Sequence, residues 1–334
     1  MSALAAMVLA AGHGVRLAPL TEEKAKPACP ALNRPIIHFP LRQVGALRPD
    51  RVVVNLHHLP ETVAAALEPP PFGLAVRTIY EPAILGTGGG LKNARALLDG
   101  AETIVLLNGD TIAETELSAL VAEHRRTGAL ATMLLLDDPR VARYGAVEVA
   151  PDGAVTDIAG LLARPGVRRG LFAGAHILSP EIFAVMPPDA AICIIRQVYL
   201  PLIAGRRGAV RAAFGAGRFF DLGAPADYLE AQWALLDDAG PFAFVRDGLQ
   251  EIAPGVWSDP TADLSPLAVI RPPALIGHAA VVDAGASIGP YAVIGARARV
   301  SAGPPIDHTV IWEEAIARGP LSHAIVTPRA TVAV

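Results

Sequence analysis

The stretch that decides the fold is Val8-Leu-Ala-Ala-Gly-His-Gly-Val-Arg-Leu-Ala-Pro-Leu-Thr21, which continues as Glu-Glu-Lys-Ala-Lys-Pro27. Its beginning, Ala5–Ala11, is short and apolar on both faces, which predicts a buried strand of a parallel sheet. Gly12 and Gly14 follow at once, so the chain leaves the strand through a turn whose backbone N–H groups are open to a ligand. Such a turn is either an ordinary tight turn or a phosphate-binding loop.

The residues around these glycines exclude two other glycine loops. A dinucleotide-binding fingerprint needs a third glycine at position 17, which is Leu17, and Pro19 argues against the helix that would follow. A P-loop needs Gly-Lys followed by Ser or Thr, and that triplet is missing from the loop. Arg16 supplies a forked positive charge and Lys26 a mobile point charge, as phosphate binding requires.

In its spacing of Gly12, Gly14, Arg16, Pro-Leu-Thr and a later Lys-Pro, the chain resembles the sugar-1-phosphate nucleotidyltransferases, or NDP-sugar pyrophosphorylases. One position departs, because the family usually has proline where this chain has Ala25. The resemblance implies an α/β fold, a doubly wound, mostly parallel Rossmann-like sheet, followed by a short left-handed parallel β-helix. The branch with this architecture is that of the mannose-1-phosphate guanylyltransferases. In the first loop the resemblance implies that four residues bind the nucleotide: Leu9, Ala11, Gly12 and Gly14.

Length and composition set limits on the function. The chain has 334 residues, enough for two domains, and is 52% hydrophobic without an apolar run near 18 residues, so we expect a soluble protein without a membrane span. Its N-terminus lacks a basic leader, and its two cysteines, Cys29 and Cys193, form no disulfide framework, which favours the cytoplasm. A net charge of −4 gives no footprint for nucleic acid.

A second glycine-rich segment runs from Glu81 to Gly90, and we expect it to be a loop that leads into a helix at Leu91–Leu98. A flexible linker is the alternative. In the family this loop holds the base and sugar of the nucleotide, which implies roles for Gly86 and Thr87. Glu81 could accept two hydrogen bonds from the adjacent donors of a guanine edge, which favours GTP. Uridylyl-transferring relatives can also carry an acid there, so UTP stays open.

Two acids follow predicted strands. Asp110 ends the apolar run Thr103–Asp110, at the edge where open α/β sheets bind ligands, although a helix-capping aspartate would also fit. Asp221 lies in the second acidic element, Phe219-Phe-Asp-Leu-Gly-Ala-Pro-Ala-Asp-Tyr228. The resemblance implies that Asp110 and Asp221 together bind the catalytic Mg²⁺, which prefers oxygen ligands. We expect Asp227 only to start the helix that runs to Leu236.

The sugar phosphate is assigned to three residues. The segment Arg143–Glu148 resembles the family's Arg-Tyr-Gly-Val-Val-Glu, which implies a sugar contact at Gly145, and Asn108 is placed beside it. Relatives usually continue with Glu-Lys-Pro, whose lysine holds the phosphate. Here Arg164 stands at the lysine position without a preceding acid. An arginine can bind phosphate through two hydrogen bonds, but with a different reach.

The C-terminal part is a six-residue repeat, which predicts a parallel β-helix of three to five coils. Aliphatic residues recur at Leu264, Ile270, Ile276, Val282, Ile288, Ile294, Val300 and Ile306, with alanine four residues after each of the first six. We therefore expect a catalytic domain at 1–238, a connector at 239–255 and the β-helix at 256–334. The β-helix predicts a homo-oligomer. His278 and His308 are candidates if it instead transfers acyl groups.

The predicted reaction joins an NTP, with GTP favoured, to a sugar 1-phosphate, with mannose 1-phosphate favoured, and releases pyrophosphate. Arg16 and the loop amides would hold the leaving phosphates, Lys26 would bridge phosphates at the reacting centre, and Mg²⁺ on Asp110 and Asp221 would offset charge. Three alternatives stay open: another pyrophosphorylase of this fold such as a uridylyltransferase, a non-catalytic regulatory subunit that binds a nucleotide sugar, and a bifunctional acyltransferase.

Overall fold

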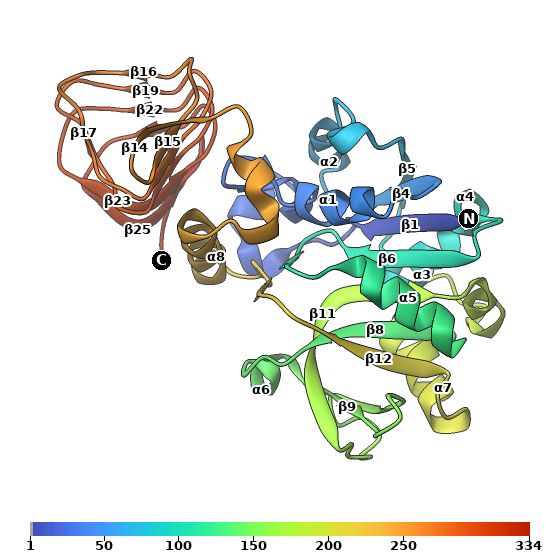
Figure 1. The fold of residues 1–334 in the computed structure, drawn as a ribbon. Coiled ribbons are helices and arrows are strands. Elements are labelled where there is room, and N and C mark those ends of the chain that lie inside the picture. Colours follow the sequence, from blue (N-terminus) through green and yellow to red (C-terminus); the bar gives the residue numbers. More distant parts are fainter. Residues whose placement is uncertain (1–2) are drawn as a thin grey trace. The chain divides into compact units, whose positions relative to one another are not determined.

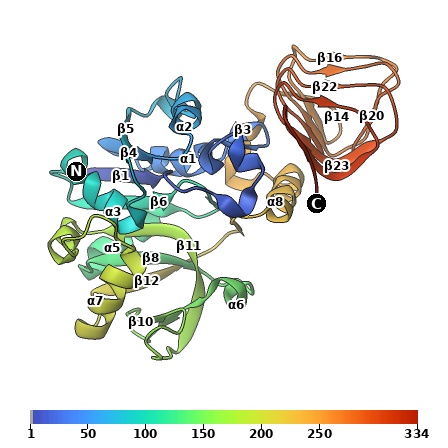
Figure 2. The same cartoon turned by 180° about the vertical axis from the view of Figure 1, so that it is seen from behind.

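The computed structural model describes residues 3–334, which divide into two compact units. The first unit combines residues 3–13 with Ile37–Phe219, and the second combines Gly14–Ile36 with Phe220–Val334. Gly14–Ile36 and the helix α8 (Pro225–Asp237) thus belong with the C-terminal coils, and the predicted domain boundaries at 238 and 255 stay predictions. Figures 1 and 2 show the elements of both units from two sides.

The first unit is built on a twisted sheet whose order is β10-β9-β11-β6-β1-β4-β5, with β8 and β12 added beside β11. Strands β6, β1, β4 and β5 run parallel, whereas β11 runs antiparallel to β6, β8 and β9. The strands are β1 (Leu4–Leu9), β4 (Arg51–Leu56), β5 (Val76–Tyr80), β6 (Thr103–Asn108), β7 (Ile112–Ala113), β8 (Ala131–Leu136), β9 (Ala146–Val149), β10 (Val155–Ile158), β11 (Arg168–Leu178) and β12 (Val210–Gly215).

Helices alternate with these strands, as the sequence predicts for a doubly wound sheet. In α5, Leu117, Leu120, Val121 and His124 are buried at helical spacing, and Gly128 ends the helix in the left-handed conformation. The helices are α1 (His38–Ala46), α2 (Pro60–Ala66), α3 (Gly86–Asn93), α4 (Arg95–Leu98), α5 (Leu117–Thr127), α6 (Val141–Tyr144) and α7 (Leu200–Gly205).

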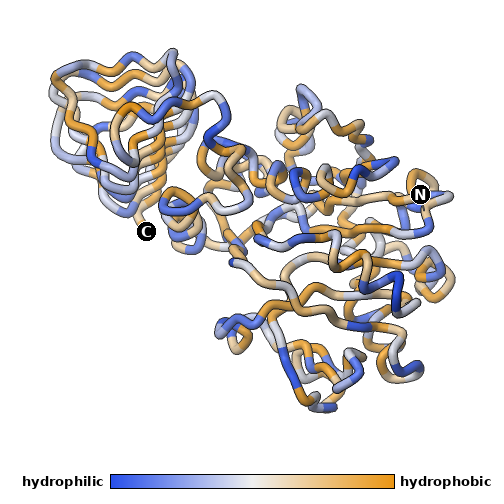
Figure 3. Tube along the Cα trace, viewed as in Figure 1, coloured by the Kyte–Doolittle hydropathy of each residue, from blue (hydrophilic) through white to orange (hydrophobic). Residues whose placement is uncertain are grey.

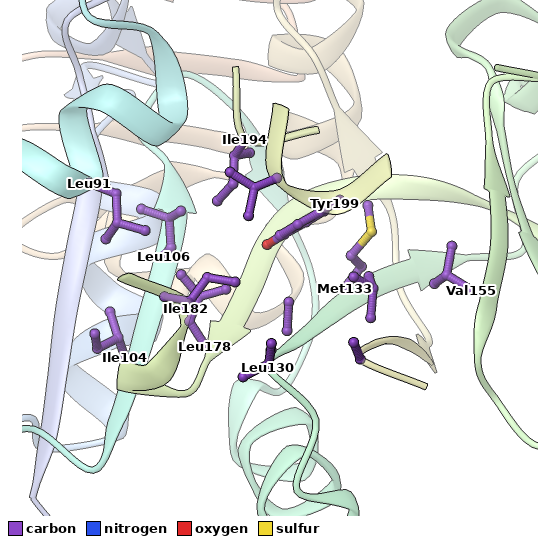
Figure 4. Packing of buried hydrophobic residues seen from close by; sticks show 14 of the residues in the cluster. Leu91, Ile104, Leu106, Leu130, Met133, Val155, Leu178, Ile182, Ile194 and Tyr199 are labelled. Atoms are coloured by element: carbon purple, nitrogen blue, oxygen red, sulfur yellow. The ribbon is translucent and has the colours of Figure 1, made fainter. Parts of the chain in front are cut away.

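A large apolar cluster stabilises this unit. It includes Met7 of β1, Leu106 of β6, Met133 of β8 and Tyr199, all fully buried, and Figure 4 shows several of its members at close range. Burial of this kind contributes about 25 cal/mol for each Å² of apolar surface removed from water, so the cluster fixes the strand ends that carry the candidate site.

The second unit contains the β-helix. Its strands form parallel ladders, β16-β19-β22-β24 on one side and β15-β18-β21-β23-β25 on another, with β17-β20-β23 as the third. The strands are β13 (Phe219–Phe220), which begins in the first unit, β2 (Pro30–Ala31), β3 (Arg34–Pro35), β14 (Gln250–Ala253), β15 (Val256–Ser258), β16 (Asp263–Leu264), β17 (Val269–Ile270), β18 (Ala274–Ile276), β19 (Val281–Val282), β20 (Ser287–Ile288), β21 (Ala292–Ile294), β22 (Arg299–Val300), β23 (Ile306–Ile311), β24 (Ile316–Ala317), β25 (Leu321–Val326) and β26 (Thr331–Ala333).

The six-residue repeat accounts for the core of these coils. Ile276, Ile288, Ile294 and Val300 are fully buried, as are the alanines of the repeat from Ala274 to Ala298, whereas Ala268 in the first coil is only partly buried. Figure 3 shows hydrophobic positions lying above one another in successive coils. The predicted fold class, a Rossmann-like sheet followed by parallel β-helical coils, is therefore confirmed.

One predicted element is wrong in its bounds. The second half of the segment Glu81–Gly90, expected to be a glycine loop ahead of a helix at Leu91–Leu98, is helical, because α3 already begins at Gly86. Four glycines lower helix propensity by roughly 1 kcal/mol each relative to alanine, which is why the sequence predicts a loop. Packing overrides that preference.

Candidate active site

In the second unit, the Gly14 turn is shaped by contacts with Thr21 and Lys26. Gly14 has φ +62°, and a Cβ atom on it would lie 2.9 Å from Thr21 Cγ2 and 3.0 Å from Lys26 Cβ. The Thr21 hydroxyl donates a hydrogen bond to the Gly14 carbonyl at 3.3 Å. Three short 3₁₀ helices then follow, at Val15–Leu17, Leu20–Glu22 and Lys26–Ala28. The motif spacing therefore reflects one packed turn, in which Gly14 is required by both conformation and space.

Three of the four predicted catalytic residues lie together in this unit. The Arg16 guanidinium donates to Asp221 Oδ2 through both terminal nitrogens at 3.2 Å. Lys26 Nζ donates to the Asp221 carbonyl oxygen at 2.7 Å and lies 3.9 Å from Asp221 Oδ1. The Lys26 side chain is 4% exposed and the Asp221 side chain 12% exposed, whereas Arg16 is 61% exposed. Arg16 can therefore reach a ligand from solvent, while Lys26 is held by the backbone of Asp221.

Gly223 allows this arrangement. A Cβ atom at Gly223 would lie 2.4 Å from Asp221 Oδ2 and 2.7 Å from an Arg16 nitrogen. No larger residue fits against this ion pair without moving it. Sequence reasoning treated Gly223 only as part of the motif. Its signal was its position two residues after the acid.

In the first unit, the end of β1 is fixed by a buried polar chain. The Ala10 N–H donates to Asn55 Oδ1 at 2.8 Å, and Asn55 Nδ2 donates to Glu81 Oε1 at 2.8 Å. The Leu85 N–H donates to Glu81 Oε2 at 3.3 Å. Asn55 is the residue that sequence reasoning missed, since an asparagine inside an apolar strand is the signal of a buried polar partner. It holds the backbone just before the glycine turn.

Glu81 is paired inside the first unit. Its side chain is fully buried, and its two oxygens face Asn55 and Leu85 rather than solvent. A Cβ atom on Gly90 would lie 2.8 Å from Glu81 Oε1, so the helix α3 closes over the carboxylate. In this structure the carboxylate orders the loop through Asn55 and Leu85, and the guanine contact predicted for Glu81 stays a prediction.

The glycines of α3 serve packing. Cβ atoms on Gly86 and Gly88 would lie 2.8 and 3.1 Å from the Ile192 carbonyl oxygen, and one on Gly89 would lie 2.3 Å from the Ala190 carbonyl oxygen. The N–H groups of Gly88 and Gly89 both donate to Ile192 O, at 2.8 and 3.1 Å. The first turn of this helix is thus capped by the chain's own backbone.

Thr87 takes part in the same attachment, because its hydroxyl accepts a hydrogen bond from the Ile194 N–H at 3.1 Å. Gly86 is exposed and has φ +70°. The structure therefore gives Thr87 a structural partner, and the nucleotide contacts of Gly86 and Thr87 stay predictions.

Just before the acid that follows β6, the chain approaches the end of the neighbouring strand β1 closely. The Gly109 N–H donates to the Leu9 carbonyl at 2.8 Å, and a Cβ atom on Gly109 would lie 2.7 Å from that oxygen. Asp110 follows at the carboxyl end of the sheet, half-buried. Glycine at position 109 therefore permits this close approach. The next residue, Asp110, lies at the carboxyl edge of the sheet, where open α/β sheets generally bind ligands.

The predicted sugar-binding residues occupy three places in the first unit. Asn108 lies beside a small pocket that Thr111 and Gly174 also line. Gly145 ends α6 with φ +90°, and a Cβ atom there would lie 2.9 Å from Ala159 Cβ. Arg164 is exposed, and its nearest acceptor for the guanidinium is the Ile203 carbonyl at 3.5 Å.

The loop that carries Arg164 is ordered by two acids, of which Asp157 is buried and Glu148 is half-buried. Asp157 is 2% exposed and accepts the N–H groups of Leu162 and Arg164 at 3.0 and 3.1 Å. Glu148 accepts the Gly166 N–H at 3.0 Å. These carboxylates fix the backbone of the loop and leave the Arg164 side chain on its surface.

The two histidines proposed for acyl transfer have different surroundings. His278 is exposed, with Nδ1 at 2.8 Å from Thr261 Oγ1 and 3.5 Å from Asp259 Oδ1. His308 is stacked between Tyr291 and His323. Acyl transfer by either histidine stays a prediction.

The residues implied for Mg²⁺ have suitable chemistry. Mg²⁺ selects carboxylate and water oxygens, and Asp110 and Asp221 both provide carboxylates. The Asp221 oxygen Oδ1 lies 3.9 Å from Lys26 Nζ, beyond hydrogen-bond distance, so the carboxylate can still accept a further partner. The donor set therefore fits magnesium.

The class of protein follows from these features and from comparison with known proteins. Residues 5–238 match the family described as nucleotidyl transferase, so the chain belongs to that family. This confirms the resemblance drawn from the motifs. The chain is thus a nucleotidyltransferase by family, and its fold and its paired Arg16, Lys26 and Asp221 accord with that membership.

Two relatives and one solved structure match much of this chain. The UTP–glucose-1-phosphate uridylyltransferase of Synechocystis sp. is 27% identical over 329 residues, which cover 92% of this chain and 82% of that protein. The mannose-1-phosphate guanylyltransferase of Mycobacterium tuberculosis is 27% identical over 285 residues, which cover 84% and 77%. The crystal structure of HddC from Yersinia pseudotuberculosis superposes with a TM-score of 0.58 and 24% identity, over 69% of this chain and 99% of that chain, which shows the fold alone.

Among residues 3–334, the helices are all too short or too polar to cross a bilayer.

Proposed function

We propose that this chain joins an NTP to a sugar 1-phosphate, forming an NDP-sugar and pyrophosphate, with GTP and mannose 1-phosphate as the favoured pair. The observation that carries the proposal is the cluster of Arg16, Lys26 and Asp221 around the Gly14 turn in a nucleotidyl transferase fold. Similarity to a mannose-1-phosphate guanylyltransferase supports the choice of substrates. Equal identity to a UTP–glucose-1-phosphate uridylyltransferase makes that pair the second candidate.

The chemistry needs positioning and charge neutralisation. A phosphate oxygen of the sugar phosphate attacks the α-phosphorus of the NTP in line, and this oxygen is already an anion, so no general base is required. Two polyanions must approach each other. Arg16 is suited to hold the leaving β- and γ-phosphates, because its guanidinium is solvent-exposed and its two terminal nitrogens point the same way.

Lys26 is suited to the reacting centre. Its ammonium is buried and fixed at 2.7 Å from the Asp221 carbonyl, so little reorganisation accompanies its contact with a phosphate. Asp110 and Asp221 would hold Mg²⁺, which would offset charge on the phosphates when bound. Asp221 also balances the charge of Arg16 and Lys26 in the free protein, which lowers the cost of keeping two cations together.

A pyrophosphate-release assay tests the proposal. The full-length protein is assayed with the four common NTPs against a panel of sugar 1-phosphates at fixed Mg²⁺ concentration. We expect one pair to dominate and Asp221→Asn to lower kcat/KM by about 100- to 1000-fold. Asp227→Asn is the matched control, since Asp227 lies in the first turn of α8 and carries no proposed catalytic role.

If no combination of NTP and sugar 1-phosphate released pyrophosphate, the catalytic proposal would be refuted. If the protein released no pyrophosphate yet bound an NDP-sugar in calorimetry, a role as a regulatory subunit would replace it. A dominant UTP and glucose 1-phosphate signal would instead establish the second candidate.

Self-association and location belong to the same proposal. We infer a homo-oligomer formed through the β-helix, whose stacked coils end in the strand β26. Light scattering of the full chain and of an Ile316→Lys variant tests this, because Ile316 is 58% exposed on a coil face. An NTP substrate and two free cysteines favour the cytoplasm.

A further inference from the structure

A column of aromatic rings lies at one corner of the β-helix. Tyr291, His308 and His323 occupy equivalent positions in successive coils, and all three have left-handed backbones with φ of 57°, 45° and 50°. The rings of Tyr291 and His308 are 5.0 Å apart, and those of His308 and His323 are 4.8 Å apart with an angle of 4°. This last distance is the spacing of neighbouring β-strands. Two imidazoles are therefore held parallel by the coil repeat.

The same edge of both imidazoles faces a set of oxygen atoms. His308 Nδ1 lies 2.9 Å from Asp307 Oδ1, and His323 Nδ1 lies 2.9 Å from Ser322 Oγ. The Ser322 hydroxyl donates to Asp307 Oδ1 at 2.6 Å, which joins the two coils. Two imidazole nitrogens and one carboxylate thus converge.

We propose that His308, His323 and Asp307 form a binding site for a divalent transition metal ion of the zinc class, separate in ligand chemistry from the catalytic magnesium. One ligand atom from each of these three residues lies within 4.8 Å of the others. Imidazole nitrogen with a carboxylate oxygen is the donor set that Zn²⁺ and its neighbours favour, whereas Mg²⁺ favours oxygen alone. A water molecule would complete a four-coordinate site.

The change needed for binding is small. Tetrahedral Zn²⁺ with bonds near 2.05 Å needs ligand atoms about 3.3 Å apart. The His308 and Asp307 atoms are already 2.9 Å apart, so the main adjustment is a tilt of the two stacked rings toward each other at Nδ1. Because Nδ1 would bind the metal ion, each neutral imidazole must carry its proton on Nε2. A neutral histidine can move its proton from Nδ1 to Nε2 without a change of charge. The left-handed backbones of both residues keep the side chains directed to this edge.

Trp233 of α8 supports the ring column. Its indole lies edge to face with His308 and His323, at centroid distances of 5.2 and 5.4 Å and angles of 89° and 85°. The tryptophan restricts rotation of both imidazoles, which leaves their Nδ1 edge directed toward Asp307 and Ser322. Preorganised ligands lose less conformational entropy on binding, which favours affinity.

The β-helix provides a matched control. His278 also lies beside a carboxylate and a hydroxyl, those of Asp259 and Thr261, but it is more exposed than His308, which stacks on a second imidazole. If the proposal is right, His278 contributes nothing to metal affinity. The comparison separates a two-histidine site from an ordinary histidine–aspartate contact.

Calorimetry with ZnCl₂ alone, on the full chain without nucleotide or Mg²⁺, tests the proposal. We expect one ion per chain, with affinity lowered more than about 100-fold in His308→Asn and His323→Asn, about 10-fold in Ser322→Ala and not at all in His278→Asn. Asparagine is chosen because it tolerates the left-handed conformation, so the coils should fold. Circular dichroism melts confirm folding of each variant.

Visible absorption of bound Co²⁺ gives a second readout, since its ligand-field bands report coordination directly. Absence of zinc binding to the wild-type chain, or equal affinity in His323→Asn and His278→Asn, would overturn the proposal. Neither result depends on the transferase activity. Failure of the catalytic proposal and failure of the metal site are thus told apart.

Discussion

The two glycines of the first turn look equivalent in the sequence, yet the structure assigns them different constraints. A Cβ atom on Gly12 would meet no atom within 4 Å, and its φ lies outside the left-handed region. Gly14 instead has φ +62°, and a Cβ atom on it would lie 3.0 Å from Lys26 Cβ. Replacing each glycine by alanine therefore separates the conformational role of the turn from its role toward a ligand.

For Gly14→Ala, we expect a loss of stability of about 2–4 kcal/mol. A left-handed alanine costs about 1–2 kcal/mol, and overpacking against Thr21 Cγ2 at 2.9 Å adds about 1–3 kcal/mol. The reduced entropy of the unfolded chain returns about 0.4–1 kcal/mol. In thermal unfolding this corresponds to roughly 5–15 °C for a unit of this size.

The same substitution should lower activity through Lys26. Its ammonium is positioned at 2.7 Å from the Asp221 carbonyl, and a displacement of about 1 Å at a reacting centre can cost about 100-fold in rate. Gly12→Ala should leave the melting temperature unchanged within about 2 °C, since small exposed substitutions fall within about 0.5 kcal/mol. Thr21→Ser in the Gly14→Ala background removes the methyl contact and should restore part of the stability. Equal stability of the two alanine variants would refute the reasoning.

Three further substitutions test the first unit. Gly89→Ala should destabilise the protein by more than about 3 kcal/mol in chemical unfolding, because the new Cβ atom would lie 2.3 Å from the Ala190 carbonyl oxygen. Alanine favours helices over glycine by about 1 kcal/mol, which is too little to offset this clash. A neutral or stabilising effect would contradict the packing. Glu81→Gln should lower the stability by about 1–3 kcal/mol, because an amide nitrogen would face the Asn55 donor. It should leave the ratio of GTP to UTP turnover unchanged, and an altered ratio would support base recognition by Glu81. Burial lowers the pKa of His176 to about 3, so the folded protein keeps this ring neutral while the unfolded chain protonates it below about pH 6.5. The contribution of His176 should therefore lower the unfolding free energy by about 1.4 kcal/mol for each pH unit between 6.5 and 3. In urea titrations at several pH values, His176→Gln should remove this contribution to the pH dependence.

The sequence predicts most of the fold because its patterns are local. The first strand, predicted at Ala5–Ala11, is found at Leu4–Leu9, and the six-residue repeat forms the core of the coils. The antiparallel course of β11 was not predictable in this way. Strand direction depends on which distant strand β11 pairs with, and Arg168–Leu178 has the same apolar character in either direction.

The candidate site divides along the same line. Arg16 and Lys26 could be identified because a short motif with a fixed backbone requires them, and both lie with Asp221 in the structure. The role of Glu81 is harder to predict, because a carboxylate after a strand can face either a ligand or a buried amide. Its contact with Asn55, twenty-six residues earlier, depends on the tertiary fold and not on the local sequence.

The glycines of α3 show why composition alone misleads about ligands. A glycine run permits close approach of any group to the backbone, and the sequence does not say which group approaches. Here the approaching group is the chain itself, since Gly88 and Gly89 donate to the Ile192 carbonyl. A nucleotide that used these same amides would have to displace Ile192, so any base contact of this segment has to come from the exposed Gly86 end of the helix. The stability of the α3 packing and the recognition of the base are for that reason separable by mutation.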